Sequence, residues 1–360
     1  MEFPDHILNP PTQSHANRPD QPPKLSVALQ SPDNLTTVKT TLGHLRNQTI
    51  AEDLEIVMVT PSIDDLDAVR DVLSAFQGYT LVTCPAEEGM SIMRGLGIRA
   101  STAPYIAIGE DHCAPHPTWA EKLLEAFDLP EGYAGVAVAV HNANPASMLS
   151  WANLTFGYLN FMAPLKRCEV PMIPGSNAVF RKAALDKFGD DLLSMFGREG
   201  GLQEKMVAQG DKFIQYPDAK VYHKNLARWS STWALRYHVG ANLAHAMITK
   251  KNMGMGMRAV RSLFTPIDGA FRMLKIVKRL TQRGYKLTPK ILIGGAIASA
   301  MHALGMFVGL WNGGEGSEME LYWLEFHRDQ HMLPGERGRN VVLDHCPELA
   351  DEGSYQPVPL

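Results

Sequence analysis

The stretch "YIAIGEDHCAPHPTW", residues 105–119, raises the first question about fold and function. A short apolar run at residues 105–108 has the length and composition of a buried strand. A glycine ends it, and Glu110, Asp111 and His112 follow. Polar side chains at this point indicate either a solvated turn or a ligand site, because parallel α/β sheets bind ligands at the carboxyl ends of their strands. For the tripeptide alone, the solvated turn is the commoner outcome.

The chain on either side of this stretch alternates between strand-like and helix-like segments. Apolar runs of strand length lie at residues 25–31, 54–62, 79–85, 104–112 and 132–141. Segments with apolar residues at helical spacing separate them. This alternation predicts a Rossmann-like α/β fold, with a mostly parallel central sheet and helices on both of its faces. From residue 228 to residue 311 the strand signals stop and we expect helices.

The composition limits the classes of protein to consider. The 360 residues carry a formal charge of −4, which gives no general attraction to nucleic acid. The four cysteines, Cys84, Cys113, Cys168 and Cys346, form no CxxC pair. This scatter favours reduced cytosolic thiols over a disulfide framework or a zinc knuckle.

Composition also divides the chain into four expected segments. Pro, Asn and Gln dominate residues 1–23, which predicts a disordered N-terminal segment. The α/β domain is expected at residues 24–227 and a helical region at residues 228–312. Acidic residues then accumulate, which predicts an acidic C-terminal tail at residues 313–360.

Glu110 and His112 are spaced to bind a metal ion together. Alternate residues of an extended segment share a face, so the carboxylate and the imidazole can point the same way. Carboxylate oxygens suit Mg²⁺ or Mn²⁺, and the imidazole tilts the choice toward Mn²⁺. His223 ends a later strand-like segment, and we expect it to meet the other two as a third ligand. A plain strand-edge histidine is the alternative.

Two further segments carry residue types that suit sugar chemistry. Gly175, Ser176 and Asn177 begin a predicted strand, where glycine permits close backbone approach and the amide both donates and accepts hydrogen bonds. Glu199 lies in a Gly-rich loop ahead of a helix, and a carboxylate there can act as a general base. The structural alternatives are a plain turn and a helix-capping acid.

Taken in order, these segments resemble the inverting family 2 glycosyltransferases of the GT-A fold, from about residue 25 to residue 225. "LSVALQSPDNLTTVKTTLGHLRNQT" resembles the opening strand and helix of that family. "SIMRGLGIRASTAPYIAIGEDHCAPHPTWAEKLLEAF" resembles its central block, where an Asp-x-Asp motif ends a strand and Pro-x-x-Trp follows. "IPGSNAVFRKAAL" and "REGGLQEKMVAQGDKFIQYPDAKVYH" resemble its acceptor-side turn, its base-carrying loop and its closing strand with a terminal histidine.

The resemblance implies transfer of a sugar from a nucleotide-diphosphate sugar to a hydroxyl of a glycan or glycolipid, by a single displacement with inversion. Residues 110–112 would occupy the Asp-x-Asp position, which binds a divalent cation, Mn²⁺ or Mg²⁺, on the donor diphosphate. The implied roles are donor binding by Ser31, Arg94, Glu110 and Asp111, metal binding by Glu110, His112 and His223, acceptor binding by Gly175, Ser176 and Asn177, and proton abstraction by Glu199.

Several positions depart from the family pattern. The second strand ends in "VTPS", residues 59–62, where the family has acids that hold the base and ribose. Gly95 replaces an asparagine expected near the pyrophosphate, and Glu199 stands in place of an aspartate. These departures leave the donor nucleotide open and favour, as the alternative, an inactive nucleotide- or sugar-binding protein of the same fold. A nucleotidyltransferase is less favoured, because "LQSPDNL" lacks a Gly- and Lys-rich phosphate loop.

The helical region combines basic and apolar character. Residues 250–290 carry eleven Lys and Arg residues and a single acid, and residues 291–311 are about long enough to span a bilayer. An amphipathic, basic segment is typical of proteins that lie on an anionic membrane surface. We therefore expect a cytoplasmic protein at the inner face of the cell membrane. A transmembrane span and a buried helical hairpin are the alternatives.

Overall fold

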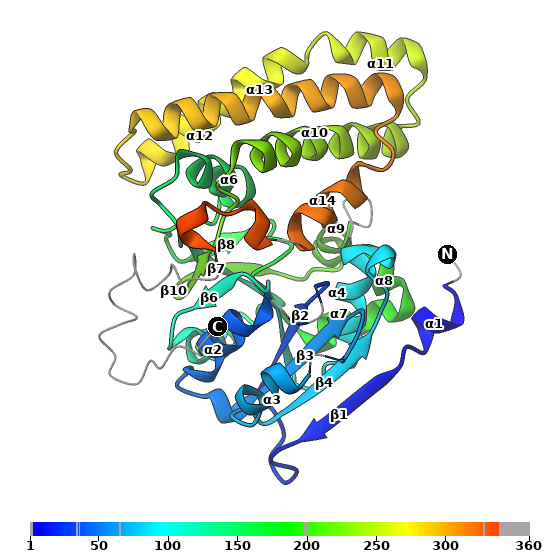
Figure 1. Ribbon diagram of the computed structural model, residues 1–360, viewed down its shortest axis with the longest axis vertical. Coiled ribbons are helices and arrows are strands. Elements are labelled where there is room, and N and C mark those ends of the chain that lie inside the picture. Colours follow the sequence, from blue (N-terminus) through cyan, green and yellow to red (C-terminus); the bar gives the residue numbers. More distant parts are fainter. Residues whose placement is uncertain are drawn as a thin grey trace. The chain divides into compact units, whose positions relative to one another are not determined.

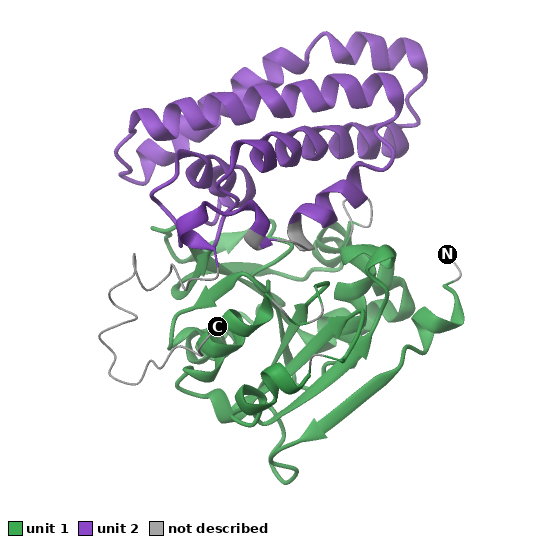
Figure 2. Cartoon of the chain, in the orientation of Figure 1, with its two compact units in different colours: residues 1–141, 163–223, 340–360 green, residues 142–162, 224–339 purple. Residues whose placement is uncertain are grey.

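The computed structural model describes residues 3–337, except residues 34, 36, 65, 197–200 and 327. These residues form two compact units (Figure 2). Unit 1 holds residues 3–141 and 163–223, and unit 2 holds residues 142–162 and 224–337. The expected single boundary at residue 227 therefore misses one segment. Residues 142–162 do not belong to the α/β unit but join the later helices in unit 2.

Unit 1 is built on one mixed sheet (Figure 1). Its strand order is β1-β4-β3-β2-β5-β9-β7-β10-β6, and β8 also pairs with β10. In chain order the strands are β1 (Thr12–Ala16), β2 (Leu25–Gln30), β3 (Leu54–Thr60), β4 (Gly78–Thr83), β5 (Tyr105–Ile108), β6 (Cys113–Pro115), β7 (Gly135–Asn142), β8 (Cys168–Val170), β9 (Ala178–Arg181) and β10 (Phe213–His223).

The expected α/β class is confirmed by the parallel strands β4, β3, β2 and β5. Every residue of β2 and β3 is buried, as expected for strands covered on both faces. The chain moves one way from β2 through β3 to β4 and then returns to β5 on the other side of β2. Since such crossovers are right-handed, helices α2 and α3 cover one face and α4 covers the other. Beyond β5 the sheet becomes antiparallel, through β9 and β7.

The helices follow in the order given by the chain. They are α1 (Asp5–Leu8), α2 (Val38–Arg46), α3 (Asp67–Leu73), α4 (Gly89–Ala100), α5 (Trp119–Phe127), α6 (Met148–Tyr158), α7 (Lys182–Leu185), α8 (Leu192–Met195), α9 (Leu202–Ala208), α10 (Trp229–Lys251), α11 (Met255–Ser262), α12 (Thr265–Gln282), α13 (Pro289–Asn312) and α14 (Ser317–Phe326).

The prediction of a disordered segment at residues 1–23 is wrong for most of its length. Strand β1 pairs antiparallel with β4, and Ile7 of α1 is buried in a cluster with Val59 and Val82. All five residues of β1 are exposed, so its sequence has no apolar alternation. Backbone hydrogen bonds hold this edge strand in the sheet. Because these bonds do not depend on the type of side chain, the amino-acid composition could not reveal the strand.

The expected acidic tail also contains ordered structure. Helix α14 lies inside residues 313–360, and its Leu324 packs with Leu226 and Leu235 of unit 2. Acidic side chains of α14 lie between apolar ones, so net charge alone did not reveal the helix. Residues 338–360 lie outside the described part of the chain.

Unit 2 is a helical bundle in which α13 packs against α10, α12 and α6 (Figure 1). Glycines allow very close backbone approach: a Cβ atom at Gly305 would lie 2.0 Å from the carbonyl oxygen of Tyr237, and one at Gly240 would lie 2.1 Å from that of His302. Among the described helices, α13 alone is long and apolar enough to cross a membrane, and half of that apolar window is buried within the protein. Its apolar character therefore serves, at least in part, helix packing.

We expect Gly305→Ala to destabilise the protein, because the added methyl overlaps the Tyr237 carbonyl and α13 must shift away from α10. The cost should be about 1–3 kcal/mol, measured as a lower midpoint of thermal unfolding. Gly157→Ala in the exposed part of α6 is the matched control. Its Cβ would meet nothing within 4 Å, so the better helix propensity of alanine should leave stability unchanged or raise it by about 1 kcal/mol. Equal midpoints for the two variants would contradict this account of the α10–α13 contact.

Candidate functional site

The candidate site lies where the direction of the sheet connections reverses. Strands β2 and β5 are parallel neighbours, and the chain leaves β2 toward one edge and enters β5 from the other side. Their carboxyl ends therefore open side by side, which is the usual ligand position in α/β sheets. Ser31 and Asp33 follow β2, and Glu110 follows Gly109 at the end of β5.

Residues 110–112 form a tight turn and not the extended segment that the spacing argument assumed. The backbone N–H of Cys113 donates to the carbonyl oxygen of Glu110 at 3.2 Å, and β6 begins at once. The Thr41 hydroxyl of α2 lies 2.8 Å from the Asp111 carbonyl oxygen and 2.7 Å from that of Cys113. Glu110 and His112 do converge, but a turn fastened to α2 brings them together.

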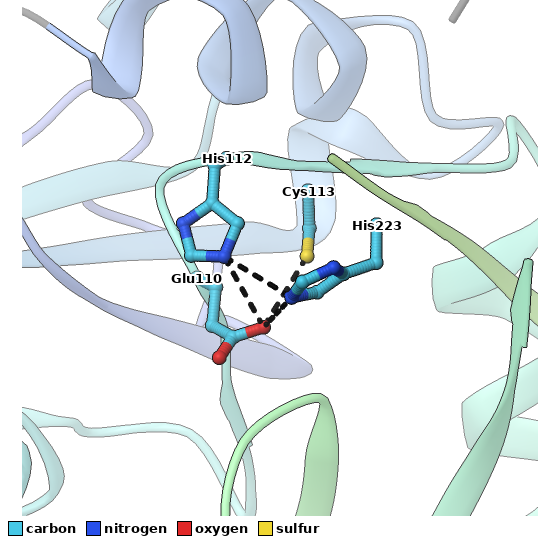
Figure 3. Close-up of side chains that lie close together, drawn as sticks. All are labelled: Glu110, His112, Cys113 and His223. Carbon is cyan, nitrogen blue, oxygen red and sulfur yellow. Dashed lines mark hydrogen bonds and ion pairs between the residues drawn. The ribbon is translucent and has the colours of Figure 1, made fainter. Parts of the chain in front are cut away.

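Four side chains of unit 1 converge at this turn (Figure 3). The Nε2 atoms of His112 and His223 lie 3.2 Å apart, and the Glu110 Oε2 lies 3.7 Å from the first and 3.3 Å from the second. The Cys113 thiol donates to the same Glu110 oxygen at 3.4 Å. All four potential ligand atoms lie within 4.8 Å of one another. The two imidazoles, a carboxylate and a thiol thus form one compact set of metal-ligating groups.

Strand pairing brings His223 to this set across 110 residues of sequence. His223 ends the eleven-residue strand β10, which pairs antiparallel with the three-residue strand β6. In that register His223 lies directly opposite Cys113. Side chains of directly opposed residues lie on the same face of a sheet, so the pairing alone carries the imidazole to the thiol. Sequence analysis did not predict β6.

Two polar residues orient the cluster from its sides. Asp111 Oδ1 lies 2.8 Å from Nδ1 of His112. A carboxylate there favours the tautomer with the proton on Nδ1, so that Nε2 presents its lone pair to the cluster. The Asn177 amide donates to Glu110 Oε2 at 2.6 Å and lies 3.4 Å from the Cys113 sulfur. Asn177 has a left-handed backbone with φ of 54°, and its N–H donates to the Ile108 carbonyl at 2.7 Å.

The other predicted site residues are distributed around the same end of the sheet. Arg94 of α4 donates to the Ser176 hydroxyl at 2.6 Å, and Gly175 has no atom within 4 Å of a notional Cβ. The Ser31 hydroxyl accepts from the backbone N–H of Leu35 at 3.0 Å. The structure therefore joins Asn177 to the metal-ligating cluster and Ser176 to Arg94. Glu199 lies outside the described residues.

A close contact between two helices explains why residue 95 is a glycine. A Cβ atom at this position of α4 would lie 2.7 Å from the Cα of Leu193 in α8. The asparagine expected at this position from the resemblance would collide with the backbone of α8, whereas glycine permits the close contact between α4 and α8.

Cys113 and Asp33 are candidate site residues that the sequence did not single out. Cys113 follows His112 directly, but its role depends on the turn and on β6. Asp33 accepts a hydrogen bond from the Thr37 backbone N–H at 3.1 Å. Burial, and then the negative charge of Asp111, raise the pKa of Asp33 above its usual value. This coupling links the end of β2 to the end of β5.

The raised pKa of Asp33 predicts a specific pH dependence of stability. The folded protein holds the Asp33 proton more tightly than the unfolded chain does, so Asp33 lowers stability as pH rises above its ordinary pKa of 3.8. Asp33→Asn removes this contribution. The free energy of unfolding of the variant, relative to wild type, should therefore increase from pH 4 to pH 7 in urea titrations. A relative stability that stays flat or falls over this range would contradict the assignment.

Comparison with known proteins identifies a familiar segment around the site. Residues 33–189 match the sequence model of the family described as glycosyl transferase family 2. No curated protein matches the chain in sequence. Among solved structures, the mannosyltransferase PcManGT from Pyrobaculum calidifontis, in complex with GDP-Man and Mn²⁺, is 14% identical with a TM-score of 0.48, covering 90% of this chain and 92% of that one. The structure of S. aureus TarS 1-349 in complex with UDP is 12% identical with a TM-score of 0.43, covering 80% and 90% respectively. The segment that carries Glu110, His112, Cys113 and Asn177 is thus similar in sequence to the family 2 glycosyltransferases.

Proposed function

We propose that this protein is a glycosyltransferase, which moves a hexose-type sugar from a nucleotide-diphosphate sugar to a hydroxyl of a glycan or lipid-linked acceptor with inversion. One observation carries the proposal: the Glu110–His112–His223 cluster lies at the carboxyl ends of β2 and β5, inside or beside the segment that matches family 2. Parallel sheets bind nucleotides at such a point.

The residues of the cluster fit a divalent cation. His112 and His223 are buried, Glu110 is half-buried, and their ligand atoms already face one another (Figure 3). A divalent cation held by these residues would supply positive charge that offsets the negative charge on the departing nucleoside diphosphate. Asp111 holds His112 in the required tautomer, and Asn177 holds the Glu110 carboxylate by its amide.

We assign the donor side to Ser31, Arg94, Glu110 and Asp111, and the acceptor side to Gly175, Ser176 and Asn177. Arg94 supports this assignment because its guanidinium suits a diphosphate and already lies 2.6 Å from the Ser176 hydroxyl. The open space at Gly175 leaves room for the backbone to approach a sugar ring.

Glu199 is our proposed base for the displacement. The acceptor oxygen attacks the anomeric carbon while the bond from that carbon to the diphosphate oxygen breaks, and the bonding electrons leave with the diphosphate. The acceptor proton passes to the Glu199 carboxylate. Attack from the side opposite the leaving group inverts the anomeric centre, so a single base suffices.

A second candidate function is nucleotide or sugar binding without transfer. The "VTPS" end of β3 and the Gly95–Leu193 contact both remove polar groups expected around a nucleotide donor. Binding and turnover therefore need separate measurements.

Nucleotide binding is the first test of the proposal. In calorimetric titrations with UDP, GDP and TDP, we expect one nucleotide to bind only when a divalent cation is present. His112→Ala should abolish this metal-dependent binding, because it removes a central ligand. His15→Ala, on the exposed strand β1, is the control and should bind as wild type does. A folded wild-type protein that binds none of the three nucleotides would contradict the nucleotide-sugar proposal.

Glu199→Gln separates the two candidate functions. For a transferase it should leave nucleotide binding intact and lower transfer from the matching nucleotide sugar by about 10²–10⁴-fold. Nucleotide binding by wild type without any transfer or hydrolysis of the corresponding donor would favour the non-catalytic function.

We also propose that the protein works on the cytoplasmic face of the membrane, where a lipid-linked acceptor would lie. Large apolar side chains are exposed along α11 and α12 in unit 2: Met255, Met257, Val260, Leu263, Phe264, Ile267, Phe271 and Leu274, each about half exposed or more. An apolar surface of this extent is uncommon on a protein that meets only water.

Charge supports an anionic bilayer as the partner of this surface. The exposed stripe of α12 runs through Ile267, Phe271 and Leu274 and continues with Lys278, beside exposed Lys275 and Arg279. The single acid of residues 250–290, Asp268, pairs with Arg261 at 2.5 Å. An open apolar groove of about 480 Å³ lies between α12 and α13, lined by small residues and by Met273, Leu304 and Phe307. Its size and lining suit a hydrocarbon chain.

Vesicle binding tests the membrane proposal. We expect the protein to co-sediment with vesicles that contain phosphatidylglycerol and to bind pure phosphatidylcholine vesicles much more weakly. Replacing Lys275, Lys278 and Arg279 together by Gln should weaken binding on the order of 100-fold at low salt, since each surface charge contributes roughly 1 kcal/mol. The matched control replaces Lys166, Lys205 and Lys212, which are exposed in unit 1, by Gln. Equal loss in both triple variants, or self-association without vesicle binding, would overturn the proposal.

A further inference from the structure

We propose that Cys113 is a fourth metal ligand and that, with Glu110, His112 and His223, it forms a zinc-type centre in place of a magnesium or manganese site. This inference rests on the metal site of the proposed function and names the class of ion that the site prefers. It does not depend on whether the protein transfers a sugar.

The donor atoms of the cluster are unlike those of a magnesium site. Mg²⁺ is bound by oxygen atoms, from carboxylates, water and phosphates. Here two imidazole nitrogens and one sulfur accompany a single carboxylate. Sites with nitrogen and sulfur ligands bind Zn²⁺ more tightly than Mn²⁺, and thiolate ligands select Zn²⁺ among the common redox-inert divalent ions.

The separations among the nitrogen and oxygen ligand atoms agree with tetrahedral coordination. Zinc with its usual bond lengths holds nitrogen and oxygen ligands roughly 3.3–3.4 Å apart at the corners of a tetrahedron. The three separations among His112, His223 and Glu110 are 3.2, 3.3 and 3.7 Å. An octahedral Mg²⁺ site would bring neighbouring oxygen ligands to roughly 2.9 Å. The Cys113 sulfur lies 3.4 Å from the Glu110 oxygen, and all four ligand atoms lie within 4.8 Å of one another.

The surroundings of the cluster match those of a zinc site. Asp111, which would be an oxygen ligand in a magnesium site, instead lies 2.8 Å from Nδ1 of His112. A carboxylate behind a histidine is the common outer contact of zinc-bound imidazole. His112, Cys113 and His223 are buried and Glu110 is half-buried, so three of the four ligands are shielded from competing water.

The absorption spectrum of bound Co²⁺ tests this inference directly. Co²⁺ is the probe because it takes zinc-type sites and reports its ligands. We expect the metal-free protein to bind one Co²⁺ with the intense visible bands of tetrahedral coordination and a near-ultraviolet band from thiolate-to-cobalt charge transfer. Stoichiometric Zn²⁺ should displace the Co²⁺, whereas a thousandfold excess of Mg²⁺ or Mn²⁺ should not.

Cys113→Ser should remove the charge-transfer band and weaken Zn²⁺ binding by roughly tenfold or more. Cys168→Ser is the matched control, because Cys168 is an exposed thiol away from the cluster, and it should retain the wild-type spectrum. His223→Ala should alter the visible bands, since it removes a nitrogen ligand. Because serine is nearly isosteric with cysteine, circular dichroism of Cys113→Ser should match wild type and exclude loss of the fold.

A weak, octahedral Co²⁺ spectrum without the thiolate band, or displacement of Co²⁺ by Mn²⁺ at equal concentration, would overturn the zinc assignment. The outcome is separable from that of the proposed function. Zinc binding with the thiolate signature but no nucleotide binding would uphold this inference and reject the nucleotide-sugar donor. Metal-dependent nucleotide binding with Mn²⁺ and no thiolate band would do the reverse.

Discussion

The parallel pairing of β2 with β5 is the constraint on which the site depends. It fixes two strand ends, from distant parts of the sequence, as neighbours at one edge of the sheet. The carboxylates of Asp33 and Asp111 then lie near enough for one to perturb the other, and the turn after β5 is held by Thr41 of α2. Like charges held together in this way attract a cation, and nearby imidazoles decide which cation binds best.

The antiparallel half of the sheet completes what the parallel half begins. Strand β9 runs next to β5 and delivers Asn177 to the Glu110 carboxylate, while β10 delivers His223. The site therefore draws on both halves of the sheet. The turn after β5 in the parallel half supplies Glu110 and His112, and the antiparallel half supplies Asn177, Cys113 and His223.

Sequence was informative where local pattern and burial coincide. The apolar runs of β2, β3, β4 and β5 predicted the parallel sheet, and the strand-end rule placed Glu110 and His112 at its opening. Sequence failed where structure depends on pairing alone: β1 is wholly exposed and β6 is three residues long, so neither leaves a periodic pattern. The participation of Cys113 depends on β6. In α13, small and apolar residues are equally typical of a membrane span and of close packing on α10, and backbone contacts such as that between Tyr237 and Gly305 show the second use.

The register of β6 and β10 has a mechanical consequence. Cys113 and His223 are opposed residues on two adjacent strands, and β6 ends the order of the sheet. An ion held by both would link the two strands across this three-residue ladder, much as a disulfide does, and would fasten the edge strand of the sheet. Loss of the ion would then loosen the pairing of β6 with β10 before it affected the parallel strands. Occupancy of the proposed site and order in residues 113–115 should therefore rise and fall together, so that a bound ion would contribute to the fold as well as to the chemistry.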